Sequence, residues 1–175
     1  MSENRSQERS EVGDERLRDE PGSSLTVANR LSELGITLPS VAAAAGSYVP
    51  TVQSGNLLYT SGQLPFVDGM LPATGKVGAE ISPEDGKSYA RLAALNVLAA
   101  ADAAVGLDNV VRLVKVVGFV ASAPGFTAQP GVINGASDLF VEVLGEAGRH
   151  ARSAVGVAEL PLGTPVEVEA IFEVR

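Results

Sequence analysis

VVRLVKVVGFVAS, residues 110–122, is the stretch that decides the fold. A strand with one face in water alternates apolar and polar side chains, whereas a strand covered on both faces is apolar almost throughout. Residues 110–122 follow the second pattern, which predicts a strand inside a sheet that is covered on both sides. The helices of the chain can cover only one of these sides. An apolar face of this extent usually marks a protein interface, so we expect the protein to form oligomers.

Two predicted helices flank this strand. The first begins at Ser82-Pro83-Glu84-Asp85, where Ser is a favoured N-cap, Pro fits the first helical position and the acids lie at the positive end of the helix dipole. We expect it to run from Pro83 to about Val105 and to stop at Gly106. The second is expected over about residues 129–147, because one stripe collects its apolar side chains: Val132, Ile133, Ala136, Leu139, Phe140, Val143 and Leu144.

Strands are expected on both sides of these helices. Residues 56–65, NLLYTSGQLP, are typical of a strand that enters a Ser-Gly turn, and residues 66–82 are typical of a loop. Residues 151–160 and 165–175 are two strand-like runs, predicted to pair as a hairpin across the PLGT turn. The order β-α-β-α-β-β indicates an α+β sheet with its helices packed on one face.

The chain has 175 residues, of which 45% are hydrophobic and 19% charged, and this length and composition indicate one globular domain. Residues 1–24 contain four Arg, seven acids and almost no apolar side chains, so we expect a disordered acidic tail before a domain at 25–175. That domain adds a short N-terminal helix with Ser24 as its N-cap and Gly35 after its last turn. The N-terminus lacks the apolar stretch of a secretory signal, so we expect a cytoplasmic protein that is not bound to membranes.

Charge and residue inventory exclude several classes of chemistry. The net charge of −8 disfavours binding to nucleic acid, and the tail accounts for only −3 of it. Without Cys and with one His, the chain lacks thiolate metal sites and Cys nucleophiles. Neither a P-loop nor a G-x-G-x-x-G motif is present, and Ser61 is not in a nucleophile elbow. We therefore expect no metal and no cofactor, and the chemistry rests on carboxylates, Arg, hydroxyl and amide groups.

Three carboxylates share one face of the last predicted strand: Glu167, Glu169 and Glu173. One interpretation is a solvated acidic face; the other is a site that needs a nearby cation, and Arg152 is available on the preceding strand. An Arg fork can hold an acidic substrate while a glutamate orients water, although a structural ion pair between them is the commoner arrangement. His150, as a lone histidine, is more often a hydrogen-bonded structural residue than a ligand.

The chain resembles the reactive-intermediate deaminase (YjgF-like, Rid) family. The resemblance rests on GSYVPTVQSGNLLYTSGQLP (46–65), the segment 90–122, the helix around Asn134 and ARSAVGVAELPLGTPVEVEAI (151–171). It implies a chorismate-mutase-like (bacillus type) fold and a homotrimeric barrel with pockets between subunits. It also implies hydrolysis of 2-imino or 2-enamino acids to 2-keto acids and ammonia, without metal or cofactor.

The resemblance also implies roles for single residues. Arg152 matches the Arg that binds the substrate carboxylate, and Glu167 matches the Glu that positions the hydrolytic water. Tyr48 and Asn134 match groups that line the pocket, although Tyr in such a loop and Asn near a helix start are usually structural.

Departures from the family pattern indicate a divergent subgroup. Ala154 stands where Cys is common, Gly156 where Glu is frequent and His150 where Pro is usual. Two functions therefore stay open: an imine deaminase, or a non-catalytic trimeric binder of small carboxylates and keto acids. Ribonuclease activity, ascribed to some relatives, is disfavoured by the net charge of −8 and the single His.

Overall fold

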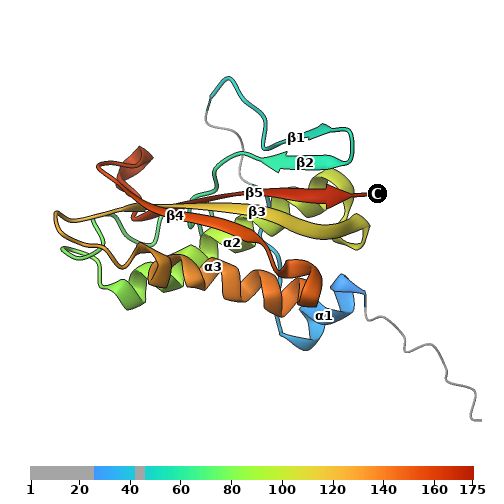
Figure 1. Ribbon diagram of the computed structural model, residues 1–175, viewed down its shortest axis with the longest axis horizontal. Coiled ribbons are helices and arrows are strands. Elements are labelled where there is room, and N and C mark those ends of the chain that lie inside the picture. The colour runs from blue at the N-terminus through green and yellow to red at the C-terminus, as the bar shows by residue number, and fades with distance from the viewer. Residues whose placement is uncertain (1–25, 42–45) are drawn as a thin grey trace, which may run out of the picture.

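The computed structural model describes residues 26–41 and 46–175. The predicted tail at 1–24, and Ser24 with it, lie outside these described residues. One five-stranded sheet runs in the order β1-β2-β5-β3-β4 (Figure 1). Its strands are β1 Thr51–Ser54, β2 Leu57–Thr60, β3 Val110–Ala121, β4 Ala151–Val157 and β5 Val166–Val174. The helices are α1 Val27–Glu33, α2 Pro83–Val105 and α3 Gln129–Leu144.

The predicted C-terminal hairpin is wrong. Strand β3 lies between the two last strands, pairing with β4 in parallel and with β5 antiparallel. Strand β4 follows β3 through the crossover helix α3, and such a βαβ connection places the returning strand parallel to the first. Strand β5 then enters the sheet between β3 and β2. Strand β3 thus has a paired strand on each side, and its helix-facing side chains, such as Val116 and Val120, are buried.

Helices α2 and α3 cover one face of the sheet, and the core lies between them and the strands (Figure 1). Alternate residues of β5 point into this core: Val166, Val168, Ala170, Phe172 and Val174 are all buried. Gly118 of β3 brings α3 close, because a Cβ there would lie 2.5 Å from Cδ1 of Ile133. The Ile133 side chain of α3 therefore packs directly on the backbone of β3 at Gly118.

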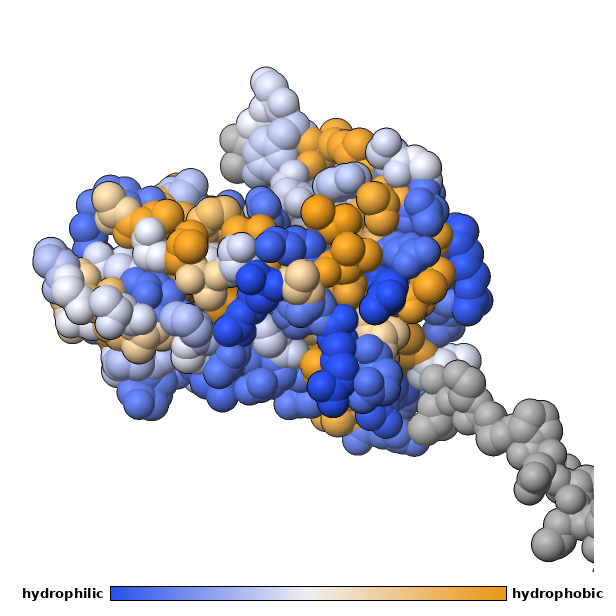
Figure 2. Space-filling view, viewed as in Figure 1, coloured by the Kyte–Doolittle hydropathy of each residue, from blue (hydrophilic) through white to orange (hydrophobic). Residues whose placement is uncertain are grey.

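The opposite face of the sheet carries apolar side chains that the described residues do not cover. Val155 of β4 is 44% exposed and Tyr59 of β2 is 40% exposed, and Val117 and Phe119 of β3 are only half-buried. Figure 2 shows hydrophobic side chains gathered over the sheet and hydrophilic ones over the helices. We refer to this side, with Val117, Phe119, Val155 and Glu167, as the open face.

Most predicted helices and strands are confirmed, with different ends. Helix α2 has the predicted bounds, and Ser82 caps it by accepting a hydrogen bond from the Asp85 amide at 3.0 Å. Helix α3 ends at Leu144 and continues as a 3-10 turn, Gly145–Gly148. Helix α1 is capped by Thr26, so the expectation for Ser24 is wrong. Strand β1 was not expected, because its four residues stand between Pro and Gly.

Helix α1 is attached to the end of α3. The Arg30 Nε donates to the carbonyl oxygen of Glu142 at 2.9 Å, and the Val27 amide donates to Oδ1 of Asp108 at 2.8 Å. Among residues 26–41 and 46–175, no helix is both long and apolar enough to cross a membrane.

Candidate functional site

Arg152 lies on edge strand β4 and points toward α3. Its partner on β3 is Val116, which is buried beneath the helices, so Arg152 shares the helix-covered face. Its Nη1 donates to Oδ1 of Asn134 at 2.8 Å and to Oγ of Ser137 at 3.1 Å. Its Nη2 has only a long contact, 3.4 Å, with the carbonyl oxygen of Pro130. Helix α3 therefore holds the guanidinium from one side.

These contacts leave one edge of the guanidinium for a ligand. Of its five N–H groups, both on Nη1 have acceptors and one on Nη2 has a weak one. Across the part of the chain that the structure describes, Nε of Arg152 has no acceptor. The remaining Nε and Nη2 groups form a fork that matches a carboxylate.

Glu167 lies on β5 and points to the open face. Its partner on β3 is Phe119, and its side chain is half-buried. The carboxyl group lies against Gly62 of the Ser-Gly-Gln turn, where a Cβ atom would come within 2.7 Å of its Cδ. Burial, and then the neighbouring charge of Glu169, raise the pKa of the Glu167 carboxyl above its ordinary range.

Arg152 and Glu167 cannot serve one substrate within a single subunit. Side chains paired across a sheet lie on the same face, so the register places Arg152 with Val116 on the helix face and Glu167 with Phe119 on the open face. The Cα atoms of the two residues are also far apart. Arg152 and Glu167 are two strands apart across the sheet and three residues apart along it, which amounts to roughly 14 Å. The expectation that Arg152 lies beside these glutamates, as an ion pair or a shared site, is wrong for one subunit.

The four predicted site residues fall into two groups. Arg152 and Asn134 lie together at the β4 edge. Tyr48 precedes β1 at the opposite edge of the sheet and is 52% exposed. The Ser61 hydroxyl donates to the carbonyl oxygen of Val49 at 2.7 Å, which attaches the Tyr48 segment to the turn beside Glu167. We call the first group, with Ser137, the arginine half-site and the second, with Gly62, the glutamate half-site.

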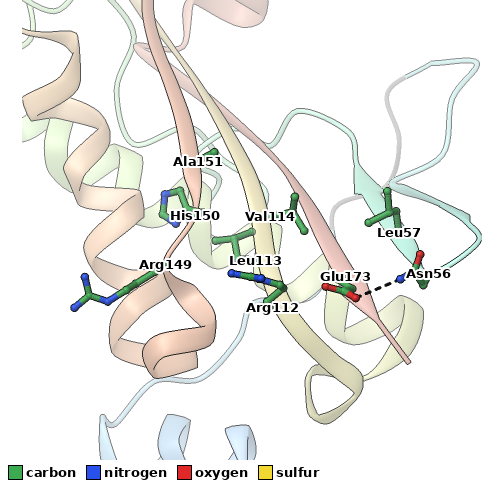
Figure 3. A pocket seen from close by; sticks show the side chains of 9 residues that line it. All are labelled: Asn56, Leu57, Arg112, Leu113, Val114, Arg149, His150, Ala151 and Glu173. Carbon is green, nitrogen blue, oxygen red and sulfur yellow. Dashed lines mark hydrogen bonds between the residues drawn. The ribbon is translucent and has the colours of Figure 1, made fainter.

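One cavity lies on the sheet next to His150 and Ala151 (Figure 3). It measures about 710 Å³ and is lined by Asn56, Leu57, Arg112, Leu113, Val114, Arg149, His150, Ala151 and Glu173. In Figure 3, Glu173 accepts a hydrogen bond from the Asn56 amide, at 3.3 Å. This cavity is open to solvent and contains none of the four predicted site residues.

The structure gives a physical reason for one departure from the family pattern. A Cβ at Gly156 would lie 2.7 Å from Nε2 of Gln129, whose side chain donates to the Ser122 hydroxyl at 3.2 Å and to the Phe126 carbonyl at 2.8 Å. Gln129 therefore occupies the space that a longer residue at 156 would need. Ala154 also faces the helices, since its partner Gly118 contacts Ile133 on that side.

Sequence reasoning missed Ser137 and Gly62. Ser137 follows Asn134 by one helical turn, and this spacing places both on the side of α3 that faces Arg152. Gly62 was noted only as part of a turn, and its closeness to Glu167 depends on the bridge between Gln63 and Val168. Within residues 26–41 and 46–175, no group of three His, Asp or Glu is arranged to hold a metal ion.

Comparison with known proteins identifies the family. The model described as "YjgF/chorismate mutase-like, putative endoribonuclease" matches residues 28–173. The chain belongs to the YjgF/Rid family. Its fold is accordingly the chorismate-mutase-like α+β fold of that family.

Relatives of this Rid-family chain have different degrees of characterisation. A Trypanosoma cruzi protein named TCP17 is 51% identical over 151 residues, 85% of this chain and 94% of its own length. The 2-iminobutanoate/2-iminopropanoate deaminase of Escherichia coli K12 is 36% identical over 136 residues, 78% of this chain and 94% of its own. A crystal structure of an Agrobacterium tumefaciens protein of unknown function shares 49% identity at a TM-score of 0.79, covering 85% and 92% of the two chains.

Proposed function

We propose that the protein hydrolyses 2-imino or 2-enamino acids to 2-keto acids and ammonia, at a site formed between two copies of the chain. The observation that carries this proposal is the division of the site residues into two half-sites: Arg152 lies at the β4 edge on the helix-covered face, and Glu167 lies on the inner strand β5 on the open face. Each half-site has one of the two capacities that the reaction needs, and neither has both.

The arginine half-site supplies substrate binding. The free Nε and Nη2 edge of Arg152 is suited to a planar carboxylate, which every 2-imino acid carries. Asn134 and Ser137 hold the other side of the guanidinium and so reduce the freedom that would be lost on binding.

The glutamate half-site supplies a proton acceptor. An imine carbon is already electrophilic, so water needs orientation and a base more than strong activation. Glu167 takes a proton from water as the oxygen adds to C2 and passes it to the imine nitrogen, which gives a neutral carbinolamine. Glu167 then takes the proton of the carbinolamine hydroxyl and passes it to the nitrogen as the C–N bond breaks, so that ammonia leaves and the keto C=O bond forms. A pKa raised by burial suits a carboxyl that both accepts and returns a proton.

The open face supplies the surface that joins two copies. Its apolar side chains, Val117, Phe119, Val155 and Ile171, lie on the same face as Glu167. We propose a homotrimer in which these faces pack together and the arginine half-site of one copy meets the glutamate half-site of the next.

The direct test is to generate 2-imino acids in situ with an amino-acid oxidase and to measure ammonia and keto-acid release with and without the protein. Faster release, lost in Glu167→Gln, is the expected result. Binding of keto acids without any acceleration would identify a carboxylate binder, and the absence of both would overturn the proposal.

A further inference from the structure

His150 is connected to Arg152 through a single hydroxyl group. Its Nδ1 lies 2.7 Å from the carbonyl oxygen of Gly148, and its Nε2 lies 2.9 Å from Oγ of Ser137. The same Oγ accepts the hydrogen bond from Nη1 of Arg152 at 3.1 Å. The ring packs edge to face on the buried Phe140, with centroids 5.9 Å apart and planes at 88°. Ring position and partners are thus determined by the fold.

The direction of each hydrogen bond in this chain follows from its ends. A carbonyl oxygen only accepts, so Nδ1 of neutral His150 carries the proton and Nε2 is an acceptor. The Ser137 hydroxyl has one hydrogen, which it donates to Nε2. Its oxygen is then left as an acceptor for the guanidinium of Arg152, which has only donors. Neutral His150 therefore takes the Ser137 hydrogen, so that the hydroxyl faces Arg152 as an acceptor.

Protonation of His150 reverses the hydrogen bond between its ring and Ser137. The imidazolium has donors on both nitrogens, so Nε2 must donate to Oγ of Ser137, and the Ser137 hydrogen loses its acceptor on the ring. Two cationic groups would then share one hydroxyl. Burial, and to a smaller extent the charge of Arg152, lower the pKa of His150, while its bond to the Gly148 carbonyl raises it. The neutral ring is the form that the fold favours.

Other charges around His150 come from several elements. Arg149, beside it, is paired with Glu146 of the 3-10 turn at 3.0 Å. Arg112 of β3 and Glu173 of β5 line the same cavity as His150 (Figure 3). On α3, Asp138 and Glu142 are paired with Lys87 and Arg91 of α2. None of these charges has a hydrogen bond or ion pair with the ring among the described residues.

We propose that neutral His150 is a positioning residue for Arg152, acting through Ser137, and that its protonation weakens carboxylate binding. This inference rests on the proposed role of Arg152 in substrate binding. The added positive charge does not compensate, because Ser137 and His150 contact the Nη1 side of Arg152, away from the Nε and Nη2 edge that takes the carboxylate. The substrate is thus held less firmly in acid although its own carboxylate stays ionised.

Affinity for 2-oxobutanoate, measured by calorimetry between about pH 5 and pH 8, tests the proposal. The wild type should lose about 10-fold in affinity toward acid, the scale of one hydrogen bond to a charged group. His150→Gln keeps an acceptor for Ser137 and does not titrate, so its affinity should stay near the neutral-pH value throughout. His150→Phe keeps the ring on Phe140 without an acceptor and should bind about 10-fold more weakly at every pH.

Kinetic measurements distinguish an effect on the position of Arg152 from a general loss of structure. His150→Phe should raise KM and leave kcat largely unchanged, since Glu167 performs the proton transfer, and His150→Gln should keep the KM that the wild type has at neutral pH. An identical pH dependence in wild type and His150→Gln, or tighter wild-type binding in acid, would overturn the proposal. If His150→Phe is unstable, the comparison of wild type with His150→Gln still decides.

Nuclear magnetic resonance gives a readout that needs no ligand. His150 is the single histidine of the sequence, so its ring nitrogens are assigned at once in an untagged protein. We expect the Nδ1–H form at neutral pH, and the Arg152 side-chain signal, identified with Arg152→Lys, should shift with the His150 midpoint. Ser137→Ala should abolish that coupling. A protein that shows the coupling but neither binds nor deaminates would contradict the proposed function alone, whereas missing coupling would contradict this inference alone.

Discussion

Gly62 and Glu167 are in contact across the turn that follows β2, and a Cβ atom at 62 would lie 2.7 Å from Cδ of the glutamate. The absence of a side chain at 62 thus makes the space in which the Glu167 carboxyl lies. The contact joins two segments about a hundred residues apart, through the bridge between Gln63 and Val168. The position of the proposed base therefore depends on a residue without functional groups.

Gly62→Ala should displace the Glu167 carboxyl and reduce turnover by about 10-fold or more, since small misplacements of a catalytic group are costly. Keto-acid binding at Arg152 should change little. Stability should fall by less than about 1 kcal/mol, because the displaced group is the end of a flexible side chain. Gly131→Ala is the matched control, because a Cβ at 131 meets nothing within 4 Å. Equal losses of turnover in both variants would contradict this reading of the contact.

Glu167→Gln should lower turnover by roughly 100-fold while keto-acid affinity is preserved, because the amide keeps size and hydrogen bonding but accepts no proton. Glu169→Gln is the control, since Glu169 lies on the same strand and face. Steady-state kinetics with freshly generated imino acids make the comparison. If both variants lose turnover equally, Glu167 is not the specific base.

Arg152→Lys should weaken keto-acid binding by about 1 to 3 kcal/mol, because the lysine keeps the charge but loses the fork. Asn134→Ala should have a smaller effect, since Ser137 still holds Nη1 of Arg152. Titration calorimetry measures both. Unchanged affinity in Arg152→Lys would show that the carboxylate binds elsewhere.

Stability should respond to the raised pKa of Glu167. A carboxyl whose pKa is higher in the folded state than in the unfolded state stabilises the fold below its unfolded pKa and loses that contribution as pH rises through the folded pKa. Glu167→Gln should therefore raise Tm at neutral pH, and the difference should disappear in acid. The gain should stay below about 1 kcal/mol, because solvent screens the exposed half of the side chain. A Tm of Glu167→Gln below that of the wild type at neutral pH would contradict this prediction.

Assembly is tested by a pair of matched substitutions. Val155 lies on the open face, 44% exposed, and Val141 lies on α3, 37% exposed. Val155→Glu should convert the proposed trimer to monomers in light scattering, because it would bury a charge in the interface. Val141→Glu should leave the trimer intact, and deletion of residues 1–24 should do the same. A monomeric wild type at low micromolar concentration would refute the trimer.

Local sequence patterns were sufficient for most of the fold. Ser82, Pro83 and the two following acids define the start of α2 without any tertiary contact. The alternation in residues 166–174 correctly separates the buried from the half-buried side chains of β5. Residues 110–121 are apolar enough to indicate a strand, and that strand is β3. These features depend on interactions between residues close together in the chain, so the sequence is sufficient to predict them.

Strand order and the division of the site were decided by tertiary structure alone. Nothing local in residues 151–175 shows that β3 separates β4 from β5, because strand pairing is a long-range choice made by the crossover through α3. The register of the strands places Arg152 and Glu167 on opposite faces, and the folding of distant segments brings Ser137 to Arg152 and Gly62 to Glu167. The sequence by itself therefore determined the family and the candidate residues. The tertiary structure decided which of them one subunit brings together, since only packing in three dimensions sets the distance between residues far apart in the chain.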